Sequence, residues 1–306
     1  MSNIHTYESP SNIALIKYWG KHGNQLPNNP SISFSLSNSK TITSIEYKKA
    51  EANIEFYFED KRNLDFEKRI KTFLNNNKDI LAFINDYSLK ISSKNTFPHS
   101  AGIASSASAF SALSACLISI KQDLGYKVDN FEKEVSTLAR LGSGSASRSV
   151  YEGVVLWGKT DLIKNSSNEY AIPINDNIHD IYKNYHDDIL IVEEETKSVS
   201  SSAGHKLMDT NPYRTEKYNQ SNINLKNILS ALKTGDLDLF INIVENEALA
   251  LHAMMMISEP SFILMKPKTL EIINAVRNFR QETKIPLCFT LDAGPNVHLL
   301  YPDRYF

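Results

Sequence analysis

PHSAGIASSASA, at residues 98–109, joins a strand expected over residues 88–96 to a long helix expected over residues 105–124. Small Gly and Ser residues let backbone N–H groups approach an anion, and the N-terminal end of a helix adds a favourable dipole. The segment therefore predicts a phosphate-binding loop in which Ser105 and Ser106 are hydroxyl donors. It is not a Walker A loop, because no Gly-Lys-Ser/Thr follows. The alternative is a small-residue helix that packs closely on a neighbour, with its serines as caps.

Strands and helices are expected on both sides of this segment without regular β–α alternation, which is typical of an α+β fold. Expected strands cover residues 43–48 and 54–58, paired with each other, and 153–157, 188–193 and 287–291. Expected helices cover residues 66–75, 79–85, 131–141 with Gly142 as the stop, a stretch through 225–232 that ends at Gly235, 237–255 and 269–281. Asn and Asp cluster near residues 165–180, so we expect a boundary there and two lobes, 1–175 and 176–306.

Composition indicates an ordinary globular protein. The chain has 306 residues, 42% hydrophobic and 22% charged, and a formal net charge of -2. This balance gives no basic field for nucleic acid or an anionic membrane. The apolar windows are too short to span a bilayer, and the N-terminus lacks the pattern of a secretory signal, so a cytoplasmic location is expected.

The cysteines and histidines of the sequence do not predict a metal site. The two cysteines, Cys116 and Cys288, have apolar surroundings and are expected to be reduced core thiols. The eight histidines show no H-x-x-x-H spacing. Metal ligands therefore stay unassigned.

LGSGSASRSVYEG, at residues 141–153, contains one cation, Arg148, among Gly and Ser. A planar guanidinium that is always charged is suited to holding a carboxylate or phosphate through two bonds. The alternative is a helix-cap loop with Arg148 in a surface ion pair of little energetic value.

NIALIKYWGK, at residues 12–21, places Tyr18 and Trp19 between Lys17 and Lys21. Two cations and two aromatic rings after an apolar lead could close over an anionic ligand. The alternative is a solvated basic pair beside a core Trp.

TLDAGPN, at residues 290–296, brings one carboxylate, Asp292, from an apolar strand into a Gly-Pro turn. A carboxylate at the end of a strand can act as a general base. The alternative is that Asp292 is only an Asx-turn residue.

Together and in this order, the motifs closely resemble those of the diphosphomevalonate decarboxylase family, in the GHMP kinase superfamily. The matching segments are NIALIKYWGK at 12–21, AGIASSA at 101–107, GSGSASRS at 142–149, VSSSAG at 199–204 and DAGPN at 292–296. The resemblance spans essentially the whole chain, and KYWGK with GSGSASRS is highly specific. It implies a two-lobed GHMP kinase fold, with a ribosomal-protein-like N-terminal lobe and a ferredoxin-like C-terminal lobe.

The resemblance also implies an activity and catalytic roles. The family converts mevalonate 5-diphosphate and ATP to isopentenyl diphosphate, ADP, phosphate and carbon dioxide, with Mg²⁺ neutralising the ATP phosphates. Asp292 would deprotonate the substrate 3-hydroxyl, Lys17 would stabilise charge on the transferring phosphoryl group, and Arg148 would hold the substrate carboxylate.

Binding residues follow from the same resemblance. The substrate would be bound by Tyr18, Lys21, Ser145 and Arg148, together with Ser200 and Ser201, for which an ordinary Ser-rich turn is the alternative. The ATP phosphates would be bound by Ser100, Gly102, Ala104, Ser105 and Ser106. The expected partner is the small-molecule substrate, and we expect binding to neither nucleic acid nor a membrane. The chain is expected to form a homodimer.

The sequence departs from the family pattern in three places. Ser147 stands where many members have Cys, and Ser202 stands where some bacterial members have a diphosphate-binding Arg. Members usually continue with another element after the DAGPN motif, so we expect a trimmed chain or a disordered tail at Phe306.

Rival functions are a monophosphate decarboxylase, a mevalonate 3-kinase and a non-catalytic small-molecule sensor on the same fold. Lys17, Arg148 and Asp292 together disfavour the pure kinase, and Lys21 with Tyr18 favours the diphosphate. A sensor usually lacks the base, whereas Asp292 is present.

Overall fold

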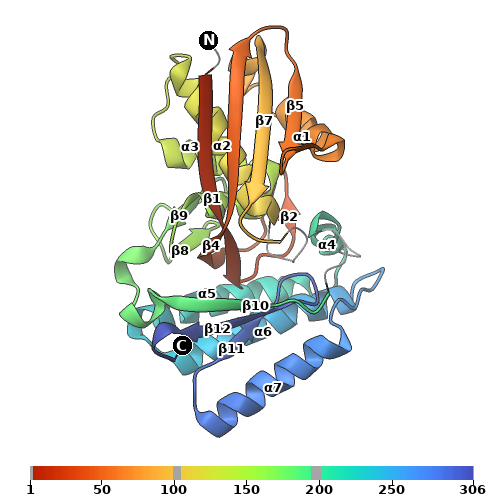
Figure 1. The fold of residues 1–306 in the computed structure, drawn as a ribbon. Coiled ribbons are helices and arrows are strands. Elements are labelled where there is room, and N and C mark those ends of the chain that lie inside the picture. Colours follow the sequence, from red (N-terminus) through yellow and green to blue (C-terminus); the bar gives the residue numbers. More distant parts are fainter. Residues whose placement is uncertain (1–2, 99–104, 194–200, 306) are drawn as a thin grey trace.

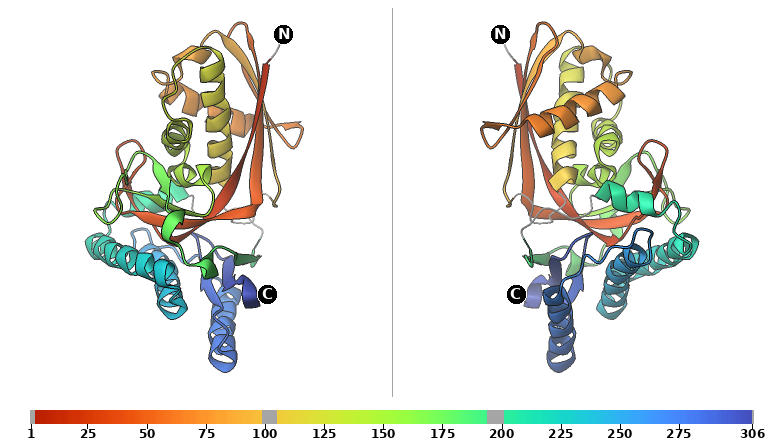
Figure 2. Two further views of the ribbon diagram at one scale, coloured as in Figure 1. Left: turned by 90° about the vertical axis from the view of Figure 1, so that its left-hand side faces the viewer. Right: turned by 90° about the vertical axis from the view of Figure 1, so that its right-hand side faces the viewer.

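The computed structural model describes residues 3–98, 105–193 and 201–305 and has the expected α+β architecture in two parts. In Figure 1 a large sheet stands upright in the upper part, and a smaller sheet with its helices lies across the lower end of the first strands. The two side views in Figure 2 show the helices of the upper part gathered on one face of the large sheet.

The large sheet is built around one long strand, β4 (Ser31–Lys49). β4 pairs along its length with β1, and it also pairs with β7 through its C-terminal half and with β8 through its N-terminal end. The strand order is β6-β5-β7-β4-β8-β9, with β1 joined to β4 off this path. The other bounds are β1 Asn3–Ile16, β5 Ile54–Phe58, β6 Lys61–Arg62, β7 Tyr87–Asn95, β8 Val154–Trp157 and β9 Ala171–Pro173, and a small hairpin pairs β2 Lys21–His22 with β3 Leu26–Pro27.

The expected pairing of residues 43–48 with 54–58 is wrong, although both segments are strands. β7 lies between them, antiparallel to β4 and parallel to β5, so that Ile91 stands opposite both Ile45 and Phe56. All three of these side chains are buried in one core. β4 and β5 therefore do not pair with each other as a hairpin. Each pairs with β7, a strand more distant in the sequence, and the three strands bury side chains on a shared face.

Three helices that the sequence predicts cover the large sheet. α1 (Leu64–Asn76), α2 (Ser105–Asp123) and α3 (Phe131–Gly142) confirm three expected helices, while the segment expected over 79–85 forms only a short 3-10 helix, Ala82–Ile84. A second 3-10 helix, Gly144–Val150, follows α3. α2 begins at the end of the sheet that faces the lower part of the molecule (Figure 1).

α3 ends at Gly142, next to the predicted stop, but Gly142 does not adopt the left-handed backbone conformation that is common just past the end of a helix. It is the last residue of α3, and the cap residue, Ser143, is extended. A Cβ on Gly142 would lie 2.1 Å from a ring carbon of Phe110. The glycine therefore permits close packing of the end of α3 on α2.

The lower part has a three-stranded antiparallel sheet in the order β10-β12-β11. α5 ends at Gly235 with φ +78, so the predicted stop is confirmed there. The bounds are β10 Tyr185–Leu190, β11 Cys288–Thr290, β12 Val297–Pro302, α4 Ser201–Leu207, α5 Arg214–Thr234, α6 Leu237–Met256 and α7 Pro267–Thr283, with short 3-10 helices at Asn175–Asn177, Asp180–Tyr182 and Asp303–Tyr305.

A shared hydrophobic core joins the two parts. Ile13 and Leu15 of β1 lie in one buried cluster with Leu232 of α5, Phe240 of α6 and Leu300 of β12. The end of β1 is thereby held against the lower helices, and the residues that follow it emerge at the junction. The lobe boundary at residue 175 stays a prediction.

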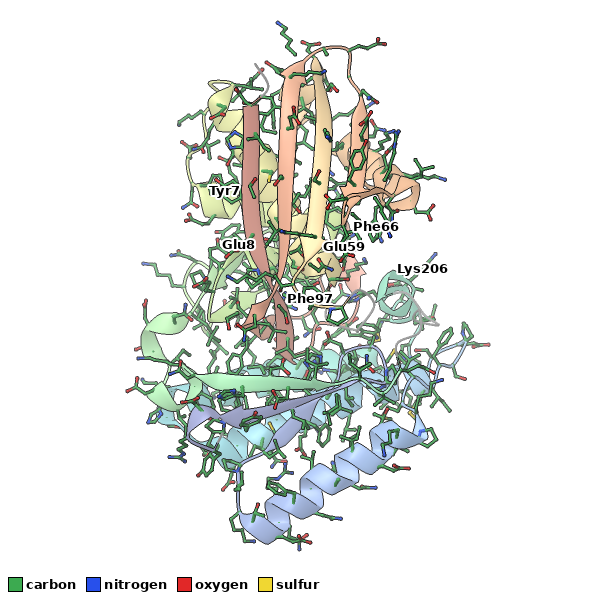
Figure 3. All side chains as sticks on the ribbon, viewed as in Figure 1. Tyr7, Glu8, Glu59, Phe66, Phe97 and Lys206 are labelled. Atoms are coloured by element: carbon green, nitrogen blue, oxygen red, sulfur yellow. The ribbon has the colours of Figure 1, made fainter. Side chains whose placement is uncertain are left out.

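The end of the large sheet where β7 ends also lies at this junction. Figure 3 labels Phe97, just beyond β7, at the level where the upper and lower parts meet. Phe97 is buried and packs with Leu36 and Ile189, which come from the upper and the lower sheet. Within the part of the chain that the structure describes, no helix could cross a lipid bilayer.

Candidate active site

An ion pair between Lys17 and Asp292 lies where the two parts meet. Lys17 directly follows β1, Asp292 follows β11, and the Lys17 Nζ lies 2.9 Å from the Asp292 Oδ1. The Lys17 side chain is 3% exposed, whereas that of Asp292 is 30% exposed. Lys17 is therefore not a solvated cation, and the Asp292 carboxylate is its ion-pair partner. The carboxylate keeps access to a ligand while the buried cation holds one of its oxygens.

Arg148 is a second buried cation, so the surface ion pair considered for it is wrong. It lies in the 3-10 helix after α3 and is 3% exposed. Its Nε and Nη2 donate to the Asn12 Oδ1 at 3.1 and 3.0 Å, and its Nη1 donates to the Ser31 hydroxyl at 2.6 Å. These bonds engage three of the five donors of a guanidinium, so the group is fixed in orientation and can still bind an anion. Burial lowers the pKa of Arg148, while the nearby Tyr18 and Asp292 raise it.

Tyr18 lies beside Arg148 in an aromatic cluster. The guanidinium carbon of Arg148 is 5.6 Å from the centre of the Tyr18 ring, and the Tyr18 and Trp157 rings form a T-shaped pair with centroids 4.8 Å apart. Burial raises the pKa of Tyr18 to about 12, so the phenol stays neutral near pH 7. A Cβ on Gly144 would lie 2.8 Å from the Tyr18 hydroxyl and 2.9 Å from the Trp157 ring. Gly144, the second glycine of GSGSASRS, thus makes room for Tyr18.

His205 is a site residue that sequence reasoning missed. It lies on α4, its ring stacks on Tyr18 with the centroids 4.5 Å apart, and its Nδ1 accepts a hydrogen bond from the Gly20 N–H at 3.0 Å. Burial lowers its pKa to about 3, with further lowering by Lys21 and Arg148. The ring is therefore neutral, with its proton on Nε2. The matched segment VSSSAG ends one residue before it, so a histidine directly after that motif was the available signal.

Lys21 and Ser145 occupy the same neighbourhood. The Lys21 Nζ donates to the Gln25 Oε1 at 2.6 Å, and burial lowers the pKa of Lys21. The Ser145 backbone carbonyl accepts a hydrogen bond from the Asn12 Nδ2 at 3.4 Å, and the Ser145 backbone also hydrogen-bonds Tyr18. The structure therefore brings together Lys17, Tyr18, Lys21, Ser145, Arg148 and Asp292.

The described part of the expected ATP loop is the first turn of α2. Ser105 begins the helix, and the Ser106 hydroxyl lies 3.4 Å from that of Ser143, in the second Gly/Ser segment. The Ser108 hydroxyl contacts the Thr41 hydroxyl at 2.6 Å and so ties this turn to β4. Three expected phosphate ligands lie outside the described residues: Ser100, Gly102 and Ala104.

The expected substrate-side serines are only partly described. Ser200 lies outside the described residues, and Ser201 begins α4. The alternative of a Ser-rich turn is therefore wrong from residue 201 onward. A Cβ on Gly204 would lie 2.5 Å from the Trp19 ring, so this glycine lets α4 pack closely on Trp19.

The side chains that the structure describes include no group of three or more His, Cys, Asp or Glu that could hold a metal. Mg²⁺ does not require such a group, because it usually keeps several waters and is bound through one or two carboxylates and substrate phosphates. Cys116 and Cys288 are buried and free, as expected.

Two family models match this chain in succession. Residues 9–169 match the diphosphomevalonate decarboxylase-like N-terminal domain, and residues 188–306 match the mevalonate 5-diphosphate decarboxylase C-terminal domain. The chain belongs to the diphosphomevalonate decarboxylase family. The motif resemblance is thereby confirmed.

Curated relatives of the family align over nearly the whole chain. The diphosphomevalonate decarboxylase of Ganoderma lucidum is 31% identical, over 98% of this chain and 78% of that protein. The diphosphomevalonate decarboxylase of Saccharomyces cerevisiae is 29% identical, over 96% of this chain and 76% of that protein.

Solved structures of diphosphomevalonate decarboxylases confirm the GHMP kinase fold. The Staphylococcus aureus enzyme is 29% identical, with a TM-score of 0.87 over 99% of this chain and 89% of that chain. The Enterococcus faecalis enzyme is 30% identical, with a TM-score of 0.85 over 99% of this chain and 90% of that chain. A complex of MDDEF with MVAPP, AMPPCP and magnesium is also 30% identical, with a TM-score of 0.84 over 99% and 90% of the two chains.

Proposed function

We propose that this protein converts mevalonate 5-diphosphate and ATP to isopentenyl diphosphate, ADP, phosphate and carbon dioxide. The observation that carries the proposal is the Lys17–Asp292 pair, 2.9 Å apart at the junction, with Arg148 as a second buried cation beside it. Family membership and the MDDEF complex with MVAPP, AMPPCP and magnesium support the same substrates.

Asp292 accepts the proton of the substrate 3-hydroxyl, whose oxygen attacks the γ-phosphorus of ATP while the bond to ADP breaks. Lys17, which forms an ion pair with Asp292, stabilises negative charge on the transferring phosphoryl group. Arg148 holds the substrate carboxylate. When the C–O bond to the new phosphate breaks, the electron pair of the bond to the carboxylate forms the alkene, and carbon dioxide leaves.

Binding roles complete the proposal. The substrate is held by Tyr18, Lys21, Ser145 and Arg148, and Ser200 and Ser201 are assigned to the same substrate. The ATP phosphates lie at the N-terminal end of α2, with Ser100, Gly102, Ala104, Ser105 and Ser106. Mg²⁺, when bound with ATP, would supply positive charge at those phosphates. The division into lobes 1–175 and 176–306, the homodimer and the cytoplasmic location are part of the same proposal.

One substrate panel tests this proposal against its rivals. The protein is incubated with ATP, Mg²⁺ and, separately, mevalonate, its 5-phosphate and its 5-diphosphate, and ADP and carbon dioxide are measured independently. We expect equal amounts of the two products, with the diphosphate preferred. ADP without carbon dioxide would indicate a 3-kinase, and preference for the 5-phosphate would indicate a monophosphate decarboxylase. Binding without any turnover would indicate a sensor.

A further inference from the structure

Helix α6 contacts the main chain of both partners of the Lys17–Asp292 pair. The Glu247 Oε2 accepts a hydrogen bond from the Lys17 backbone N–H at 3.0 Å. Five residues further along α6, the His252 Nε2 donates to the Asp292 backbone carbonyl at 3.1 Å. In an α-helix this spacing corresponds to about 7.5 Å of rise. One rigid element therefore touches both residues of an ion pair whose members are far apart in sequence.

Glu247 is itself fixed by α5. It is 0% exposed, and its Oε2 also accepts from the Lys217 Nζ at 2.9 Å. Its Oε1 accepts from the Asn224 Nδ2 at 2.7 Å and from the Ser221 hydroxyl at 3.3 Å. A buried carboxylate is tolerated when it is paired and hydrogen-bonded in this way. With all these donors in place, the carboxylate cannot turn away from Lys17 without leaving a buried donor unpaired.

The main chain of Lys17 depends on side chains for its position. β1 ends at Ile16, and beyond it the Lys17 carbonyl accepts from the Asn29 Nδ2 at 3.0 Å, while its N–H donates to Glu247. Strand pairing therefore does not fix this residue, and Glu247 supplies the contact from the lower part of the molecule.

His252 performs the corresponding task at Asp292. Its side chain is buried, and burial lowers its pKa to about 4, so the ring is neutral near pH 7 and carries one N–H. Because a backbone carbonyl only accepts, that proton lies on Nε2 and is directed at Asp292. The Gly294 N–H donates to the same carbonyl at 2.8 Å.

We propose that Glu247 and His252 are positioning residues, through which α6 sets the separation of Lys17 and Asp292 for catalysis. The kinetic consequence rests on the proposed function. The contacts themselves do not, so the two ideas can fail separately.

Matched double variants test the Glu247 contact. Glu247→Leu with Lys217→Met removes both buried charges and the acceptor for the Lys17 N–H. Glu247→Gln with Lys217→Met removes the same charges but keeps an amide oxygen that can accept. We expect the first to lower kcat by about 10²-fold, the size of effect that a misplacement of about 1 Å produces, with smaller changes in KM. The second should recover most of the lost kcat.

A second pair tests His252 and guards against misfolding of the first. His252→Phe removes the donor to Asp292, whereas His252→Gln keeps an N–H that can reach the carbonyl. The phenylalanine variant should lose kcat with little change in KM, and the glutamine variant should recover much of it. Equal kcat within both pairs, with parent-like thermal melting, would overturn the inference.

Hydrogen exchange at the Lys17 amide gives a readout that needs no turnover. It should be faster than in the parent for Glu247→Leu/Lys217→Met and parent-like for Glu247→Gln/Lys217→Met. If the parent itself turns over no substrate, the proposed function fails, and this exchange result alone decides the positioning role. Unchanged protection in both double variants would overturn it.

Discussion

Lys17 and Arg148 are both almost fully buried, and burial decides what each can do. A buried cation needs partners, and these come from Asp292 for Lys17 and from Asn12 and Ser31 for Arg148. The motifs allowed both cations to be predicted from sequence. Their partners could not be predicted, because the contacts join segments more than a hundred residues apart, without a local signal.

Lys21 tests the assignment of the substrate diphosphate. Lys21→Ala should raise KM for mevalonate 5-diphosphate by about tenfold to a hundredfold, because one charge-assisted contact is worth roughly 1.5–3 kcal/mol. KM for ATP should change less. Steady-state kinetics with each substrate varied in turn measures both. Lys268→Ala is the control, since Lys268 is an exposed cation of α7 that pairs with Glu271. An unchanged KM for the diphosphate would show that Lys21 does not bind this group.

His205 predicts a pH dependence of stability. Its pKa is about 3 in the folded protein against an ordinary 6.5, with Lys21 and Arg148 as the cations that face it. The unfolded chain therefore binds one more proton between these values, and folding stability should fall as pH drops below about 6.5. The slope from this one group is about 1.4 kcal/mol per pH unit.

His205→Asn should remove that slope, because an amide does not titrate yet still offers an oxygen to the Gly20 N–H. Urea unfolding from pH 7 to pH 4.5 measures it in the parent and the variant. His252 is present in both proteins, so its own contribution cancels. Parallel curves for the two proteins would show that His205 does not titrate as its burial implies.

At the scale of elements, helices were predictable and strand pairing was only partly so. The sequence predicted α1, α2, α3, α6 and α7 closely, and apolar periodicity through residues 225–232 predicted the second half of α5, because a helix is determined by local spacing. β1 was not among the predicted strands; polar side chains dominate its first half, and Pro10 precedes a bulge at Ser11. The partner of β5 depends on a strand that starts about thirty residues later, which local pattern does not reveal.

Gly142 gives a test at this scale. Gly142→Ala would place a methyl group against the Phe110 ring, so we expect a loss of about 1–3 kcal/mol in the free energy of unfolding. A glycine used only as a helix stop would not respond to the size of residue 110. Phe110→Leu in the same chain should therefore recover part of the loss in chemical denaturation. No recovery would contradict the packing explanation.

At the scale of the whole molecule, the site exists only because the two parts share a core. β1 ends against α5 and α6, which delivers Lys17 to Asp292 at the end of β11. The order of motifs predicted the α+β GHMP kinase fold, which the solved structures confirm. The contacts of α6 with Lys17 and Asp292 could not be predicted, because Glu247 and His252 lie in a helix with no motif around them.

Asp292→Asn is the most direct test of the account, with carbon dioxide and ADP release from mevalonate 5-diphosphate as the measurement. The substitution is nearly isosteric but removes the proton acceptor, and general-base contributions are typically ~10²–10⁴-fold in rate. Thermal melting and ATP titration establish that the variant folds and binds nucleotide. We expect both products to form at least ~10²-fold more slowly, with ATP affinity changed far less. A variant that melts normally, binds ATP and releases carbon dioxide at nearly the parent's rate would contradict the role of Asp292.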